Sequence, residues 1–455
     1  MSILAAGADT IAGYDDLVLY IEAGQKPKTD WKIGTEHEKF PFRTKDRSPI
    51  PYEGPDGIRA MLEGLTRFGW QPVLEGDKII GLSCPDSLAN VSLEPGGQFE
   101  LSGAPLDHLH QTCSEVHDHL AQVKEVGGEL DICFLGTGFT PDWTREMIPV
   151  MPKGRYGIMT EYMKKVGSYG LDMMYRSCTV QVNLDWSTES DMVKKFRVAL
   201  ALQPIATALF ANSPFTEGKP NGFRSFRSQI WTDTDTARTG MLPFVFEDGF
   251  SYERYVDYAL DVPMYFVYRD GIYHDVTGKS FRDFMAGKLE GFEGEMPTIG
   301  DWSNHLTTIF PEVRIKQFME MRGADSGPWN SICALPAIWV GLLYDGGVLD
   351  AAWDMVKKWT PDVREELRWE VPKTALATRV DRIKVLDIAR EMVDMSRAGL
   401  KARGATDGMG ADETIFLSTL DDILETGKTR ADEQLEAYHG RWNSSIEPIY
   451  DEYAF

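Results

Sequence analysis

Hydrophobic and polar residues alternate along several short stretches of the chain, and this alternation predicts β-strands. The clearest stretch is residues 178–186, "CTVQVNLDW", in which Val180, Val182 and Leu184 alternate with polar residues. Similar stretches are residues 31–40, 96–103 and 316–323. Because successive side chains of a strand point to opposite faces, each of these strands has one apolar and one polar face.

Other stretches carry apolar residues every three or four positions, which is typical of amphipathic helices. Residues 105–126 have this pattern, and a second helix begins near Ser187 or Thr188 and ends before Pro214. The chain from about residue 350 to 455 is mostly helical in pattern. A strand with one polar face that leads into a long buried helix predicts an α+β fold in which a sheet packs against helices.

The helix predicted at residues 105–126 contains a cluster of histidines: His108, His110, His117 and His119. No carboxylate joins them at the spacing of a metal site. We therefore expect a solvated helix face here, with His110 and His117 turned to solvent.

Composition narrows the classes of function. The 455 residues are 43% hydrophobic and carry a net charge of −23, so the chain can form a large core but repels nucleic acids and anionic lipids. No apolar run reaches the roughly 18–20 residues needed to span a bilayer, and the acidic N-terminus resembles no targeting peptide. These features predict a cytoplasmic protein with neither nucleic acid nor membrane as a partner.

The chain has no internal repeat and no linker-like segment, which predicts a single catalytic domain over residues 1–455, with the helical portion from about residue 350 packed on its core. The five cysteines lie far apart and form no C-x-x-C pair. This spacing argues against a structural zinc site or a secreted disulfide scaffold and favours buried, reduced thiols.

The polar faces of the predicted strands carry the candidate chemistry. The residues concerned are Glu36 and Glu38, Glu100 with Glu94 just upstream, Gln181 and Asn183, and Glu320 and Arg322. Each glutamate alone is more typical of a solvated strand face or an ion pair than of a metal site. If the strands pair in one antiparallel sheet, however, these groups gather in a carboxylate-rich trough in which like charges raise one another's pKa.

Divalent cations relieve such repulsion, and carboxylate and amide oxygens select Mg²⁺, with Mn²⁺ as the alternative. An arginine on the same face, Arg322, suits the charge of a transferring phosphoryl group. The sequence contains neither a P-loop nor a dinucleotide-binding motif. The trough therefore predicts a metal–nucleotide site that binds ATP through a sheet and a cation.

The same segments resemble those of a known family. The stretches "KIGTEHEKF", "SLEPGGQFELSGAPL", "CTVQVNLDW", "NSPFTEGKPNGF", "IWTDTDTARTGMLPFVFEDGF", "HLTTIFPEVR" and "FMEMRGADSGPW" are similar to the signature segments of glutamate–cysteine ligases of the plant and α-proteobacterial type. They extend from about residue 31 to 345 in the order found in the family. The resemblance implies a catalytic core similar to glutamine synthetase, an antiparallel sheet that forms a trough flanked by helices.

The resemblance also implies the reaction: the γ-carboxylate of L-glutamate is joined to the amine of L-cysteine, and ATP is converted to ADP and phosphate, the first step of glutathione synthesis. A related γ-glutamyl ligase that uses another amine is the alternative. A metal- or ligand-binding protein without turnover and a carboxylate–metal hydrolase without nucleotide are the other classes weighed, and the complete set of carboxylates beside Arg322 argues against both.

Residue by residue, the resemblance implies that Mg²⁺ is held by glutamates and one glutamine: Glu36, Glu38, Glu94, Glu100, Gln181 and Glu320. It implies that Arg322 faces phosphate and that Arg176 is a second catalytic residue. The candidates for binding glutamate or ATP are Arg227, Arg314, Asn183 and Trp231. His37, although between two candidate ligands, is expected on the opposite face of its strand.

Two further expectations follow from the resemblance. Residues 212–240 form a long segment rich in Gly, Pro and Thr, with Arg224, Arg227 and Arg238, and we expect it to act as a lid that keeps water from a reactive γ-glutamyl phosphate. Cys113 and Cys333 match the positions of a regulatory disulfide linked to dimerisation in plant enzymes. The resemblance to the bacterial members of the family implies a monomer, with a redox-linked dimer as the alternative.

Overall fold

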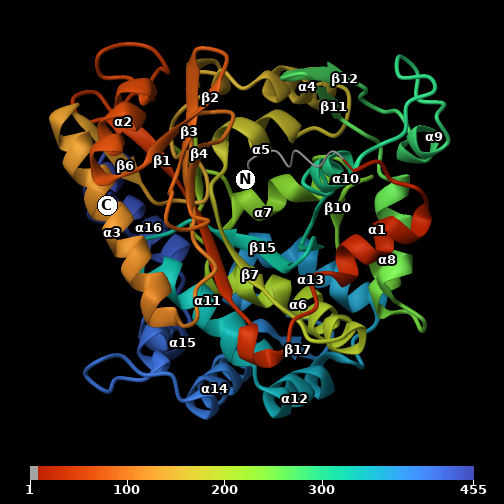
Figure 1. Ribbon diagram of the computed structural model, residues 1–455. Helices are drawn as coiled ribbons and strands as arrows, with labels where there is room; N and C mark the ends of the chain where they lie inside the picture. Colours follow the sequence, from red (N-terminus) through yellow and green to blue (C-terminus); the bar gives the residue numbers. More distant parts are fainter. Residues whose placement is uncertain (1–8) are drawn as a thin grey trace.

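The computed structural model describes residues 9–455, and its centre is a nine-stranded sheet (Figure 1). The strand order is β14-β15-β7-β1-β5-β4-β3-β2, with β6 paired to the second half of β1, and every pair in this sheet is antiparallel. Its strands are β1 (Ile33–Arg43), β2 (Gln71–Glu75), β3 (Lys78–Ser83), β4 (Asn90–Leu93), β5 (Phe99–Ser102), β6 (Ile132–Leu135), β7 (Thr179–Leu184), β14 (Val313–Ile315) and β15 (Met319–Asp325).

Helices surround this sheet. They are α1 (Tyr14–Glu22), α2 (Ile58–Leu65), α3 (Leu109–Glu129), α4 (Gly154–Met163), α5 (Gly170–Arg176), α6 (Glu189–Leu209), α7 (Phe226–Ile230), α8 (Tyr252–Asp261), α9 (Phe281–Met285), α10 (Ile299–Leu306), α11 (Trp329–Leu343), α12 (Gly346–Val356), α13 (Pro361–Thr374), α14 (Val385–Arg403), α15 (Ser418–Thr426), α16 (Arg430–His439) and α17 (Ile449–Glu452).

Four two-stranded sheets complete the fold. They are β8 (Phe215–Thr216) with β9 (Lys219–Pro220), β10 (Thr239–Gly240) with β13 (Phe310–Pro311), β11 (Phe266–Arg269) with β12 (Ile272–Asp275), and β16 (Arg379–Val380) with β17 (Ile383–Lys384). The predicted α+β class, with an antiparallel sheet, flanking helices and a mostly helical C-terminal part, is confirmed.

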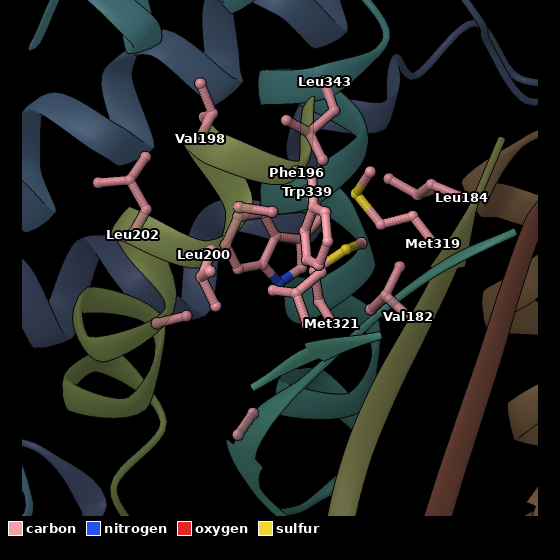
Figure 2. Packing of buried hydrophobic residues seen from close by; sticks show 14 of the residues in the cluster. Val182, Leu184, Phe196, Val198, Leu200, Leu202, Met319, Met321, Trp339 and Leu343 are labelled. Carbon is pink, nitrogen blue, oxygen red and sulfur yellow. The ribbon is translucent and has the colours of Figure 1, made fainter. Parts of the chain in front are cut away.

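The alternation read from the sequence matches the faces of the central strands. Val182 and Leu184 of β7 and Met319 and Met321 of β15 point away from the polar face into the largest hydrophobic core. Figure 2 shows these side chains packed against α6 and α11, around Trp339. Because this core also includes residues of α14 and α15, the C-terminal helices are packed on the same core as the sheet.

The N-terminus of α6 lies where the sequence predicts it. Thr188 is the N-cap, and its Oγ1 accepts a hydrogen bond from the backbone nitrogen of Asp191 at 3.2 Å. The helix ends at Leu209, and nearly all of its second half is buried. It follows directly on β7 and covers the apolar side of the central strands, which leaves their polar side free to form a site.

The prediction for the histidine cluster is wrong at His119, which is 2% exposed. Its ring contacts the rings of His37, at 5.7 Å between centroids, and Phe99, at 6.4 Å. His119 follows Val116 by three residues and precedes Val123 by four, so it belongs to the apolar stripe of α3. His117 is exposed, as predicted, whereas His110 is half-buried.

Residues 212–240 are more ordered than their composition predicts. The segment contains β8, β9, α7, a short 3₁₀ helix (Trp231–Asp233) and β10. Its beginning is tied to the end of β15, because Asp325 accepts hydrogen bonds from Ser213 at 2.7 Å and Ser225 at 2.8 Å. Local sequence patterns do not reveal hydrogen bonds to an aspartate that is 100 or more residues away in the sequence. The role of the segment as a lid stays a prediction.

Within residues 9–455, no single helix is long and apolar enough to cross a membrane. The two helices α11 and α12 meet that test only as a pair, with a bend of 92° between them.

Candidate active site

A cavity lies on the polar side of the central strands and collects most of the predicted site residues. Those that line it are Glu36, Glu38, Glu94, Glu100, Gln181, Arg227, Trp231, Arg314 and Arg322. They come from β1, β4–β5, β7, the α7 segment and the β14–β15 hairpin. The trough inferred from the strand faces is therefore present. The order of the strands in the sheet decides which of these residues, far apart in the sequence, lie next to each other.

Three carboxylates form an acidic group at the β1–β5 side of the cavity. Glu38 lies directly opposite Glu100 in the antiparallel pair, and Glu94 follows β4. Burial, and then the charges of Glu94 and Glu100, raise the pKa of Glu38 well above its usual range. Burial, and then Glu100, raise the pKa of Glu94 to about 7. These two shifts are the expected signature of buried carboxylates that lie close to one another.

Hydrogen bonds orient the acidic group. The backbone nitrogen of Thr179 donates to Glu38 Oε2 at 2.9 Å, and Ser102 Oγ donates to Glu100 Oε1 at 2.6 Å. Glu94 Oε1 has no hydrogen-bond partner among the described residues although it is buried. A buried carboxylate oxygen without a partner is unusual, and it leaves a ligand position open for a cation or a proton donor.

A basic group lies at the other side of the cavity, around Glu320. Arg314 Nη2 donates to both carboxylate oxygens, at 2.7 and 2.8 Å, Lys316 Nζ lies 3.0 Å from Oε2, and Arg322 Nη1 contacts Oε1. Burial opposes ionisation of Glu320, but the three cations outweigh it and hold its pKa well below its usual range. One fully buried carboxylate thus balances three cations, which leaves an excess of positive charge facing the cavity.

The structure separates Glu320 from the predicted metal ligands. Its side chain is not part of the cavity lining, and both of its oxygens are engaged by cations. The reason is that β14, which sequence reasoning missed, pairs with β15 and places Arg314 directly opposite Glu320. Lys316 was missed as well; its only sequence signal is its position two residues after Arg314, on the same face of the hairpin.

Arg227 supplies a further cation from α7. It is 2% exposed and lines the cavity, and its Nη2 donates to the backbone oxygen of Arg322 at 2.9 Å. Its Nε and Nη1 have no hydrogen-bond partner in the described part of the chain, nor has Nε1 of Trp231. Unpartnered buried donors beside an excess of positive charge are suited to an anionic ligand such as a carboxylate or a phosphate.

The prediction of a catalytic role for Arg176 is not supported by its position. Its side chain binds Asp172 at 2.7 Å, Glu217 at 3.0 Å and the backbone oxygen of Trp143 at 2.9 Å, and its guanidinium lies 4.9 Å from the Phe139 ring centre. None of these atoms faces the cavity lining. An arginine at the end of a helix pairs readily with an aspartate four residues earlier, so the spacing of Arg176 and Asp172 in the sequence already favours this ion pair.

Asn183 lies in a neighbouring cavity of about 480 Å³, next to the first one. Its Nδ2 donates to Glu36 Oε1 at 2.9 Å, and Glu36 lines both cavities. The second cavity also receives Lys26 and Lys32. The polar side of the sheet therefore carries two adjoining cavities that meet at Glu36.

Part of the cavity wall is apolar and was not predicted. Met159 of α4, Met173 and Met174 of α5, and Phe310 line it. These residues belong to helices and a short strand with no polar motif, so the sequence contains no signal that assigns them to a site.

His37 and the cysteines are placed as follows. His37 is fully buried on the face of β1 opposite Glu36 and Glu38, as predicted. Cys113 and Cys333 are free and buried, and burial, with Cys333 beside it, raises the pKa of the Cys113 thiol. A thiol with a raised pKa is a poor nucleophile, and the redox role of the pair stays a prediction.

The carboxylates that line the cavity are the candidate ligands for a divalent cation. Among residues 9–455, no group of three or more His, Cys, Asp and Glu side chains is already arranged to hold a metal ion. The donor set nevertheless fits a hard cation, because Glu38 and Glu94 are buried carboxylates with raised pKa values and Glu94 Oε1 lacks a partner.

Comparisons with known proteins agree on one family. A family model described as glutamate–cysteine ligase family 2 matches residues 32–452. The glutamate–cysteine ligases, chloroplastic, of Solanum lycopersicum and Arabidopsis thaliana are 58% and 57% identical to this chain over 439 residues, 96% of the chain and 82% of each relative. A glutamate–cysteine ligase of Francisella tularensis solved in complex with AMP has 13% identity and a TM-score of 0.53, covering 94% of this chain and 89% of that one. At that identity the likeness concerns the fold alone.

These relatives contradict the predicted cytoplasmic location, because they are chloroplastic by name. The prediction depended on the composition of the first 16 residues, of which residues 1–8 lie outside the described part of the chain. Local composition at one terminus does not determine the compartment in which a folded enzyme works.

Proposed function

The chain belongs to glutamate–cysteine ligase family 2, and on this basis we propose that it joins the γ-carboxylate of L-glutamate to the amine of L-cysteine at the expense of ATP. The products are γ-glutamylcysteine, ADP and phosphate. The observation that carries the proposal is the division of one cavity into an acidic group, with Glu38, Glu94 and Glu100, and a basic group around Glu320.

The reaction needs both groups. An ionised carboxylate is a poor acyl donor, so an oxygen of the γ-carboxylate first attacks the terminal phosphorus of ATP, and ADP leaves. The amine of cysteine then attacks the carbonyl carbon of the γ-glutamyl phosphate; the C–N bond forms, phosphate leaves and the amine loses a proton. Negative charge is concentrated on the phosphoryl group throughout, and Arg322 and Arg314 lie where they can balance it.

Arg227 and Trp231 are suited to holding a substrate carboxylate. Both side chains line the cavity, and the guanidinium of Arg227 lies 5.9 Å from the ring centre of Trp231. Two buried donors of Arg227 and the Nε1 of Trp231 have no hydrogen-bond partner among residues 9–455. A bidentate pair between a guanidinium and a carboxylate gives both orientation and affinity. Arg314, which is already bound to Glu320, is the second candidate.

The acidic group is suited to Mg²⁺, with Mn²⁺ as the alternative. Glu38, Glu94 and Glu100 would hold it, with Glu36 and Gln181 as further oxygen donors at the edge of the group. When bound, the cation supplies charge neutralisation for the phosphates of ATP and for the carboxylates themselves. The arrangement gives no support to Glu320 as a ligand, since three cations engage it.

The adjoining cavity is a candidate for the nucleotide. It is larger than a single amino acid requires, and Lys26, Lys32 and Asn183 line it. It meets the first cavity at Glu36, so a nucleotide placed there directs its phosphates towards the acidic group.

We further propose that the whole chain acts as one catalytic domain. This is supported by the largest hydrophobic core, which includes residues from Ile11 to Ala431 and therefore joins the sheet with the C-terminal helices.

ADP release tests the proposed function. Purified protein with ATP and Mg²⁺ should release ADP only when both L-glutamate and L-cysteine are present, and Glu36→Ala should abolish most of this activity. A panel of other amines in place of cysteine tests the alternative acceptor. ADP release without an amine, or wild-type turnover in Glu36→Ala, would contradict the proposal.

A further inference from the structure

A third cavity, of about 370 Å³, lies on the other side of β5, away from the active site. Neighbouring residues of β5 separate the two: Glu100 lines the active-site cavity, whereas Leu101 lines this one. The third cavity is bounded by α3, by residues 84–89 after β3, and by Trp70. Nothing in the proposed reaction uses it.

Its α3 wall is a stripe formed by polar side chains that range from exposed to fully buried. The residues of the stripe recur at helical spacing: Gln111, Ser114, Glu115, Asp118, His119 and Gln122. The opposite wall is apolar, with Leu101, Leu106 and Ala89. A cavity with one acidic and one apolar wall matches a ligand that is itself amphipathic.

The acidic groups of the stripe lack a cationic counterpart. Among the described residues, neither Glu115 nor Asp118 forms an ion pair, and no lysine or arginine lines the cavity. Glu115 is half-buried and accepts one hydrogen bond, from the backbone nitrogen of Ala104 at 2.9 Å. Burial raises the pKa of Glu115 to about 7, as expected for a carboxylate that has lost water without gaining a cation.

His119 provides an independent indication of a ligand. It lines the same cavity, is 2% exposed, and neither of its ring nitrogens has a hydrogen-bond partner in residues 9–455. Burial lowers the pKa of His119 well below its usual range, so the ring is neutral and can accept a hydrogen bond. The buried imidazole needs a hydrogen-bond donor, and the two carboxylates next to it need a positive charge. A donor that carries a positive charge would satisfy both.

We propose that this cavity binds the ammonium group of a small amphipathic primary amine, with Glu115 and Asp118 as its charge partners. An ammonium group has three donors, which matches two carboxylates and one neutral imidazole. The apolar chain of the ligand lies against Leu101. Trp70 also lines the cavity, and its Nε1 donates a hydrogen bond to Gln122 at 2.8 Å. A divalent metal fits less well, because no group of three or more potential metal ligands is arranged for one in the described residues.

Calorimetric titration with n-butylammonium chloride at constant ionic strength tests the proposal. One molecule should bind per chain, and n-butanol, which has the same apolar chain without the charge, should not bind. Glu115→Gln should weaken binding about tenfold or more, because it removes a charge-assisted contact but keeps the oxygen that accepts from Ala104. Asp118→Asn, at an exposed position, should weaken binding about threefold.

Two controls separate this cavity from other sites for an amine. Glu125→Gln changes a carboxylate of the same helix that lies outside the cavity and pairs with Arg67, and it should leave binding unchanged. Glu38→Gln changes the active site, which itself accepts an amine in the proposed function, and it should also leave binding unchanged. This outcome does not depend on whether the protein is a ligase.

Three results would overturn the proposal. The first is the absence of saturable binding of n-butylammonium to the folded wild-type protein. The second is equal affinity in wild type and Glu115→Gln, with thermal unfolding showing that the variant is folded. The third is stoichiometric binding of Zn²⁺ that is lost in Cys84→Ser and His119→Gln, which would identify a metal site in the cavity instead.

Discussion

Glu38 of β1 lies directly opposite Glu100 of β5 in an antiparallel pair, and both carboxylates are buried. Like charges at such positions destabilise a sheet. Both carboxylates line the active-site cavity, which indicates that they are there for a ligand and not for the stability of the fold.

Replacement of Glu38 by glutamine should therefore stabilise the free protein while it inactivates the enzyme. We expect a gain of about 1 kcal/mol in the free energy of unfolding, since one of two opposed charges is removed. ADP release should fall about 100-fold or more, the usual effect of losing one group that stabilises charge in a transition state. Denaturation in urea and the ADP assay measure the two effects; a destabilised variant with normal turnover would contradict this view of the pair.

Replacement of Glu320 by glutamine should strongly destabilise the fold. Arg314, Lys316 and Arg322 would lose their shared counter-charge, and breaking such a buried network costs about 3 kcal/mol or more. Urea denaturation measures the loss. Glu365→Gln is the matched control, since the Glu365 side chain is about half exposed and its partner Arg368 keeps a second carboxylate, Glu312, so its removal should change stability by less than about 0.5 kcal/mol.

A different outcome for Glu320→Gln would restore the role implied by the family resemblance. If the variant keeps wild-type stability but needs much more Mg²⁺ for half-maximal ADP release, Glu320 acts as a metal ligand and its contacts with the three cations are replaced when the cation binds.

Arg176 should behave as a positioning residue and not as a catalytic one. It holds the end of α5, which contributes Met173 and Met174 to the cavity, against Glu217 and Trp143. Arg176→Ala should raise the KM for glutamate and lower stability by about 2 kcal/mol, with a small change in kcat, and Arg176→Lys should recover part of both. Arg145→Ala is the control, because Arg145 is more exposed and lies 3.6 Å from Asp172. A loss confined to kcat would assign Arg176 to the chemistry.

The buried His305 should make the stability of the protein depend on pH. Burial lowers the pKa of His305 from its ordinary value of 6.5 to about 4, and its Nε2 contacts the backbone oxygen of Ala259 at 2.8 Å. Between these values the unfolded state binds more protons, so this contribution to stability is complete above about pH 6.5 and is lost as the pH falls towards 4.

The wild-type protein should therefore lose about 2 kcal/mol more than His305→Gln when the pH is lowered from 7.5 to 5. Urea denaturation of both proteins at the two pH values measures the difference, and every other titrating group cancels in the comparison. Parallel pH dependence in the two proteins would show that His305 does not titrate in this range.

Alkylation should distinguish the cysteines in the folded protein. Cys84 and Cys133 are partly exposed, whereas Cys113, Cys178 and Cys333 are buried. Brief treatment with a maleimide, followed by mass spectrometry of peptides, should label Cys84 and Cys133 first and the other three only after denaturation. Early labelling of Cys113 would show that the candidate redox pair is accessible in the native state.

Much of the site could be predicted because the relevant signals are local. A period of two along residues 178–186 and 31–40 places Gln181 and Asn183, and likewise Glu36 and Glu38, on one face of their strands. The same rule places His37 on the opposite face. The cap at Thr188 was local as well, since it lies three residues from the backbone nitrogen that it binds.

The differences between the sequence-based expectations and the structure concern residues whose environment is set from a distance. His119 looked solvated because one turn of α3 is ambiguous between two faces, and its burial depends on how α3 packs against β1 and β5. Glu320 was grouped with the acidic residues because β14 is only three residues long and gives no periodic signal, so the cations that it places beside Glu320 went unseen.

The sequence by itself determined which side chains share a face of each strand, because alternation is a property of the extended backbone. Only the tertiary structure decided which strands are neighbours and in what register. That choice depends on packing between segments far apart in the chain, and it brings Glu38 opposite Glu100 and Arg314 opposite Glu320. The first pair gathers negative charge and the second leaves an excess of positive charge, and this separation is what makes the polar face of the sheet a site.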